Sequence, residues 1–185
     1  LHVQLDPISY SGIRAANEAS FGQAVIPSYK FEQALVVLSV GADFLGTWLD
    51  GEEHTQDYIK NRNYQSLEAG KMSRHIQFET GLSMTGTNAD VRIAIKPSEE
   101  AAVLISLYNE ITGSSLAGGI QQANAAKAIK LAAQELLKNR GQAVVVAGAN
   151  DVHIQTLTNA INVAIGAYGT TIDLANYSKK YQGSE

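Results

Sequence analysis

The chain has 185 residues, of which 45% are hydrophobic and 17% are charged, and it contains no cysteine. Without cysteine it has no disulfide, no thiolate nucleophile and no thiolate ligand for an iron–sulfur cluster. Its formal net charge of -4 and the lack of a basic stripe argue against a nucleic acid or an anionic membrane as partner. No run approaches the length of a membrane-spanning helix, so we expect no direct membrane span.

The first elements expected are a strand, a helix and a second strand. His2–Leu5 has the pattern of a strand, and Ser11 is a suitable N-cap for a helix that ends at Gly22. Pro27–Phe31 then forms an extended connector to Leu35–Val40. That last run is short, unbroken and apolar, which is typical of a strand buried on both faces of a parallel sheet.

A helix is expected from Gly51 onward, because acidic residues suit the positive first turn of a helix. Tyr58, Ile59 and Leu67 would supply its weak apolar face. Arg74–Glu79 reads as the next strand, and a loop rich in turn-forming residues follows it.

Val91–Ile95 alternates like a strand and is stopped by Pro97. Ser98 is a suitable N-cap for the next helix, which has apolar residues at helical spacing and ends at Gly113. The six-residue segment 114–119 is an ordinary loop and not a domain boundary.

The last third of the chain predicts two helices around a second fully apolar strand. Gln121–Asn139 has its apolar residues on one face and polar residues on the others, Ala143–Ala147 is the strand, and Asp151 caps a helix that runs to Ile165. This alternation predicts an α/β fold, a Rossmann-like three-layer αβα sandwich with a mainly parallel sheet of about five strands.

We expect one domain over residues 1–175 and a polar, flexible tail over residues 176–185. The chain begins at Leu1 and enters a strand pattern at once, so we expect it to be a segment of a longer polypeptide.

Common catalytic and metal-binding motifs are absent from the sequence. The four histidines lie too far apart for a metal-ligand motif, and no nucleophile elbow, dinucleotide fingerprint or P-loop occurs. What remains are three loops that follow expected strands: Gly41–Trp48, Glu79–Asn88 and Gly148–Asp151. In a parallel sheet they meet at one edge, where α/β domains bind ligands. The loops either hold a ligand or contact a neighbouring domain.

Four segments together resemble a known family: residues 6–22, 35–48, 72–99 and 144–150. They are similar to the molybdopterin-oxidoreductase-like, iron–sulfur-containing subunit of bacterial alternative complex III, a quinol-oxidising respiratory complex. The stretches GADFLGTW and ETGLSMTGTNADVR carry the resemblance most specifically. That subunit is homologous to the large catalytic subunit of molybdopterin enzymes of the dimethyl-sulfoxide-reductase type.

The resemblance implies that this chain is one non-catalytic α/β domain of an electron-transfer subunit. It also implies iron–sulfur clusters in a separate ferredoxin-like region, and no cofactor, catalytic residue or metal in this segment. The expected partners are other domains of the parent subunit and the other subunits of a membrane respiratory complex. The expected location is the periplasmic face of the bacterial inner membrane.

The resemblance further marks positions that face the pterin dinucleotide in the molybdenum enzymes. In this sequence those positions are Gly41, Asp43, Glu79, Thr80, Ser98, Glu99 and Gly148. The enzymes often show Asp-Pro-Arg at residues 79–81 and Pro-Gly-Thr-Asp from residue 97, so this chain lacks a basic residue there and carries added carboxylates.

Charge at the expected strand ends also predicts loss of the ligand. Two cations, Arg92 and Lys96, stand there against six carboxylates: Asp43, Glu79, Asp90, Glu99, Glu100 and Asp151. Carboxylates beside a diphosphate repel it, so we predict that these positions are vestigial and empty. The alternative hypothesis is a pterin- or nucleotide-binding module of an oxidoreductase.

Overall fold

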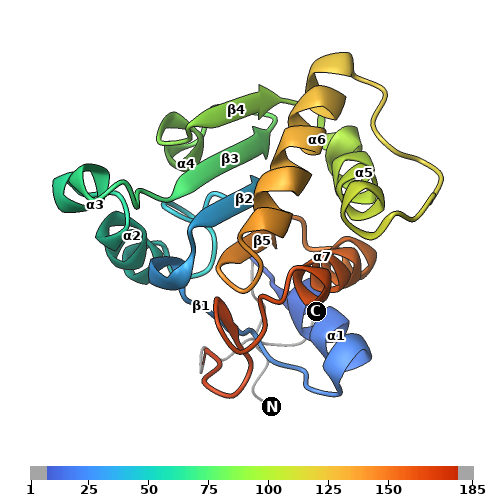
Figure 1. The fold of residues 1–185 in the computed structure, drawn as a ribbon. Helices are drawn as coiled ribbons and strands as arrows, with labels where there is room; N and C mark the ends of the chain where they lie inside the picture. Colours follow the sequence, from blue (N-terminus) through green and yellow to red (C-terminus); the bar gives the residue numbers. More distant parts are fainter. Residues whose placement is uncertain (1–7, 179–185) are drawn as a thin grey trace, which may run out of the picture.

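The computed structural model describes residues 8–178 of the chain. The elements are α1 (Ser11–Phe21), β1 (Ser28–Tyr29), η1 (Phe31–Gln33), β2 (Val36–Val40), α2 (Gly51–Lys60), α3 (Tyr64–Glu68), β3 (Arg74–Glu79), α4 (Met84–Thr87), β4 (Val91–Ala94), η2 (Pro97–Glu99), α5 (Glu100–Thr112), α6 (Ala123–Lys138), β5 (Ala143–Ala147), α7 (Val152–Ala164) and β6 (Ile172–Asp173). Figure 1 shows them arranged around a central twisted sheet.

The main sheet has four parallel strands in the order β4-β3-β2-β5, and the register places Leu38 opposite both Ile76 and Val145. Every residue of β2 is buried, as its continuous apolar sequence predicts. The α/β sandwich is therefore confirmed, with four strands in this sheet rather than about five. The strand expected at His2–Leu5 lies outside the described residues.

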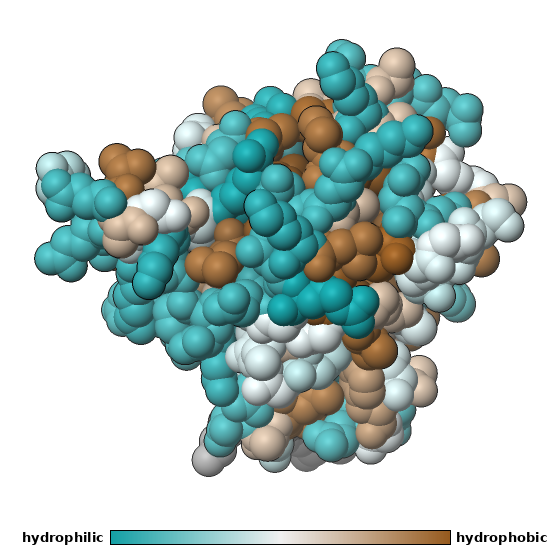
Figure 2. All heavy atoms as spheres, viewed as in Figure 1, coloured by the Kyte–Doolittle hydropathy of each residue, from teal (hydrophilic) through white to brown (hydrophobic). Residues whose placement is uncertain are grey.

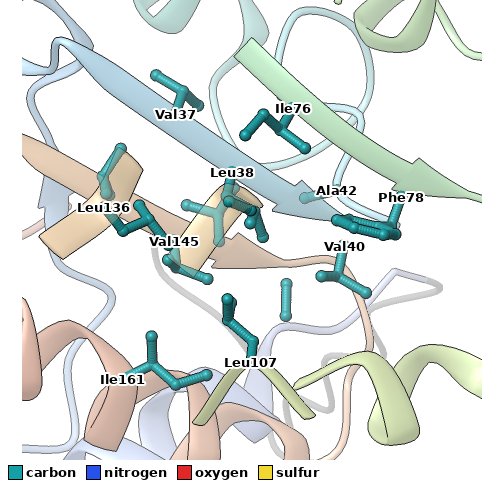
Figure 3. Close-up of a cluster of buried hydrophobic side chains, with 14 of the residues drawn as sticks. Val37, Leu38, Val40, Ala42, Ile76, Phe78, Leu107, Leu136, Val145 and Ile161 are labelled. Atoms are coloured by element: carbon teal, nitrogen blue, oxygen red, sulfur yellow. The ribbon is translucent and has the colours of Figure 1, made fainter. Parts of the chain in front are cut away.

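Helices cover both faces of the sheet. On one face Leu107 of α5, Leu136 of α6 and Ile161 of α7 belong to the same buried cluster as Leu38, and all four are fully buried (Figure 3). On the other face, Tyr58 of α2 packs against β3, where its hydroxyl hydrogen-bonds the His75 ring. The sheet is thus the middle layer of three.

A second, two-stranded antiparallel sheet joins the early and late parts of the chain. Ser28 of β1 pairs with Asp173 of β6, and Lys30 forms an ion pair with Asp173 at 2.6 Å. Each strand is two residues long, which is too short to leave an alternation in the sequence. The expected tail starts bonded to this region, because the Ser178 N–H donates to the carbonyl of Ile26.

The helix expected from Gly51 through Leu67 is two helices, which corrects the sequence interpretation. The Asn63 side chain accepts the Ser66 N–H and so caps a new helix, α3. Of the three residues expected on the apolar face, only Tyr58 is buried, whereas Ile59 is 51% exposed and Leu67 is 57% exposed.

Two expected N-caps are also displaced. Ser98 lies inside η2, where the Glu99 carboxylate accepts the Lys96 N–H, and α5 begins only at Glu100. Ser11 is the first residue of α1 rather than its cap. Asp151 is confirmed as the cap of α7, because its carboxylate accepts two N–H groups of the first turn. Across residues 8–178, no helix is long and apolar enough to cross a bilayer.

Candidate functional site at the carboxyl edge of the sheet

The loops after β2 and β5 meet backbone to backbone. Gly41 has a φ of +67°, and its N–H donates to the carbonyl of Phe78 at 2.8 Å. A Cβ added to Gly148 would lie 2.2 Å from the carbonyl oxygen of Gly41, so only glycine fits at position 148 without movement. The topology therefore brings these two predicted positions together.

Asp43 ties the loop after β2 to helix α4. Its carboxylate accepts the N–H of Thr85 at 3.1 Å, the Thr85 hydroxyl at 2.7 Å and the N–H of Thr47 at 3.2 Å. Burial raises the pKa of Asp43, but the bonds from Thr85 and Thr47 outweigh it and leave the pKa below its ordinary value. The carboxylate is thus ionised, and its bonds are made within the domain.

Glu79, the last residue of β3, is only 3% exposed and is also satisfied from within the chain. The Ser83 hydroxyl donates to its carboxylate at 2.5 Å, and the Arg92 guanidinium forms an ion pair with it. Burial raises the pKa of Glu79, whereas the Ser83 and Arg92 contacts lower it by more. Arg92, the residue of β4 that could otherwise bind a phosphate, is therefore paired with the carboxylate of Glu79.

Glu100, which the sequence analysis did not single out as a site residue, lies directly over Gly41. A Cβ at Gly41 would be 2.7 Å from its Oε1 atom. Burial raises the pKa of Glu100, and its carboxylate forms no hydrogen bond or ion pair with any residue between 8 and 178. This side chain from the first turn of α5 covers the end of β2.

The other predicted positions form the rim of this edge. Thr80 and Ser98 are exposed, and neither side chain bonds to another predicted position in the described part of the chain. Glu99 caps η2 and, together with Lys96, lines a cavity of about 420 Å³ beyond β4. Asp90 does not belong to this edge, because it precedes β4 and therefore lies at the amino end of the sheet.

Helix α1 closes the edge from the side of β5. The N–H of Gly12 donates to the side chain of Asn150 at 2.7 Å, and a Cβ at Gly12 would lie 2.8 Å from the Asp151 nitrogen. The two partners are 138 residues apart, so nothing local in the sequence indicates the contact. No group of three or more His, Asp or Glu side chains could hold a metal ion within the described residues.

Comparison with known proteins gives structural neighbours but no relative by sequence. No family model and no curated protein matches this sequence. The fold is similar to that of acetylene hydratase from Pelobacter acetylenicus, with a TM-score of 0.54 and 12% sequence identity. The similarity covers 89% of this chain and 25% of that protein, so the chain spans a quarter of its length. At this identity the similarity shows the α/β fold and not an activity.

Proposed function

We propose that this chain is a non-catalytic structural domain of a molybdopterin-oxidoreductase-like iron–sulfur subunit in a quinol-oxidising respiratory complex, alternative complex III. In that role it contacts other domains at the periplasmic face of the inner membrane, while the clusters are bound elsewhere in the subunit. One observation carries the proposal: at this edge of the sheet Asp43 and Glu79 are bonded within the chain, and Glu100 lies over Gly41.

A pterin dinucleotide presents a diphosphate, which needs N–H groups or cations at the strand ends. Here Asp43 and Glu79 already accept hydrogen bonds from the nearby donors of Thr85 and Arg92. The half-buried Glu100 covers Gly41. Carboxylates within about 8 Å of a diphosphate are incompletely screened at physiological salt. The N-terminus of α5 attracts anions, but by under about 1 kcal/mol where it is exposed. We therefore expect repulsion from these carboxylates to outweigh this attraction.

The fold comparison supports the coarser part of this proposal. Acetylene hydratase is a molybdopterin enzyme of the dimethyl-sulfoxide-reductase family, the family to which the strand-end segments of this sequence point. Nothing in that comparison bears on the respiratory complex, which rests on the resemblance of residues 6–22, 35–48, 72–99 and 144–150.

The second candidate function is a pterin- or nucleotide-binding module of a molybdopterin oxidoreductase. One feature favours it: Gly41 follows a central parallel strand in a left-handed conformation, at the edge where open α/β sheets bind ligands.

Mass spectrometry of small molecules released from the purified, denatured chain separates the two functions. We expect no stoichiometric pterin, nucleotide, molybdenum or iron, and no visible absorbance from a bound chromophore. A stoichiometric pterin dinucleotide in well-washed protein would establish the binding module instead and overturn the structural role.

A further inference from the structure

Helix α3 carries apolar side chains but buries none of its residues against the rest of residues 8–178. None of its residues is buried, and its apolar side chains Tyr64 and Leu67 are 70% and 57% exposed. Ile59 before it and Met72 after it are 51% and 41% exposed. In Figures 1 and 2 this helix projects from the body of the molecule and carries brown, apolar spheres at its tip. Helices this short gain their stability from tertiary packing.

Unpaired cations lie beside these apolar side chains. Lys71, Arg74 and Lys138 line a cavity of about 810 Å³ that begins where α3 ends, and Met72 lines it too. None of the three forms an ion pair with any residue in the described part of the chain. Asp90, also in the lining, is already paired with Arg62 at 2.7 Å.

The charge of this surface is therefore opposite to that of the whole molecule. Three cations without an ion pair in residues 8–178 lie near two carboxylates without one, Glu135 in the lining and Glu68 at the end of α3, in a chain whose net charge is -4. Aromatic residues, Met and Arg are enriched at protein interfaces, and Tyr64, Met72 and Arg74 are residues of these types. Nucleic acid does not fit, because it would need a larger basic surface without a cluster of apolar side chains.

We propose that the α3 surface, defined as Ile59, Tyr64, Leu67, Lys71, Met72, Arg74 and Lys138, docks an acidic segment of a partner polypeptide. Apolar side chains of the segment cover Tyr64 and Leu67, and its carboxylates pair with the three cations. The cations of the α3 surface are the reason for proposing an acidic segment as its partner. The α3 surface lies at the amino end of the strands, opposite the Gly41 loop. The docking proposal is therefore independent of whether a dinucleotide binds at the Gly41 loop.

Site-specific photo-cross-linking in cells that naturally contain the protein tests the proposal. The photoreactive residue p-benzoylphenylalanine replaces Tyr64 in one variant and Leu131 in the control. Leu131 is a 53% exposed apolar residue on α6. We expect a cross-link from position 64 that is absent from position 131, and peptide mapping should place it in a segment with more acidic than basic residues.

A charge-reversal pair then tests the electrostatic part. Lys71→Glu with Arg74→Glu should lower the cross-link yield from position 64 about tenfold, because attraction is replaced by repulsion. Lys127→Glu with Lys130→Glu, both exposed on α6, should leave the yield unchanged. All four side chains are exposed, and a circular dichroism melt checks that each variant folds. A basic mapped segment, a second copy of this chain, equal yields at both positions, no cross-link, or no effect of charge reversal would overturn the proposal.

Discussion

At the scale of single residues, the least expected feature is a ladder of polar side chains along one buried face of β3. The Tyr58 hydroxyl lies 3.0 Å from Nδ1 of His75, whose Nε2 lies 3.2 Å from the side-chain oxygen of Gln77. The Gln77 amide in turn donates to Glu79 at 3.3 Å. Each side chain is a hydrogen-bond partner of the next, which is why polar side chains are tolerated at these buried positions.

His75 should make stability depend on pH. Burial lowers its pKa to about 4, below the ordinary value of about 6.5 that applies in the unfolded chain. As pH falls through this window the unfolded state binds a proton first, so the folded state loses stability. Between about pH 7 and about pH 4.5 the loss should be about 2 kcal/mol. Urea unfolding of wild type and His75→Gln at both pH values measures it, and an equal pH dependence in the two proteins would disprove the assignment.

A second residue-scale prediction concerns the contact between loops. Gly148→Ala places a Cβ against the Gly41 carbonyl and should lower the free energy of unfolding by about 1 to 3 kcal/mol. Gly81→Ala is the matched control, because a Cβ there meets nothing within 4 Å. Thermal melts report both, and a Gly148→Ala variant as stable as Gly81→Ala would mean that the loops do not touch.

At the scale of elements, the sequence predicts those that carry a strong, continuous pattern. Strands β2 and β5 are recognisable because both are wholly apolar, and α7 because its apolar residues recur every three or four positions. The break between α2 and α3 was not predictable from periodicity. It depends on the Asn63 cap and on the Asn61 side chain, which donates to the Glu32 carbonyl 29 residues away.

The orientation of α7 gives a prediction at this scale. Ile161→Asp buries a carboxylate at a fully buried position and should cost several kcal/mol, about 3 or more. Val163→Asp, two residues on and 55% exposed, should change the free energy of unfolding by less than about 0.5 kcal/mol. Similar melting temperatures for the two variants would show that the helix faces the other way.

At the scale of the whole molecule, the meeting of the strand-end loops follows from topology. All four strands of the main sheet are parallel, so the segments after β2, β3 and β5 must share one edge. Which residues bond across that edge could not be predicted. Asp43 and Thr85 are 42 residues apart, and only the folded chain pairs them. Asp90 shows the same limit. It is expected at this edge from the sequence, but β4 begins only after it, so Asp90 lies at the opposite edge of the sheet.

The most direct test of the predicted loss of ligand binding is calorimetric titration of the purified chain with diguanosine diphosphate, which carries the diphosphate that a pterin dinucleotide would present to this edge. We predict no binding tighter than about 1 mM, which is roughly 4 kcal/mol. Comparing Glu100→Gln with Glu110→Gln, an exposed residue near the other end of α5, would locate any binding at this edge. A micromolar dissociation constant for the wild-type chain that changes in Glu100→Gln alone would contradict the loss and establish a binding module.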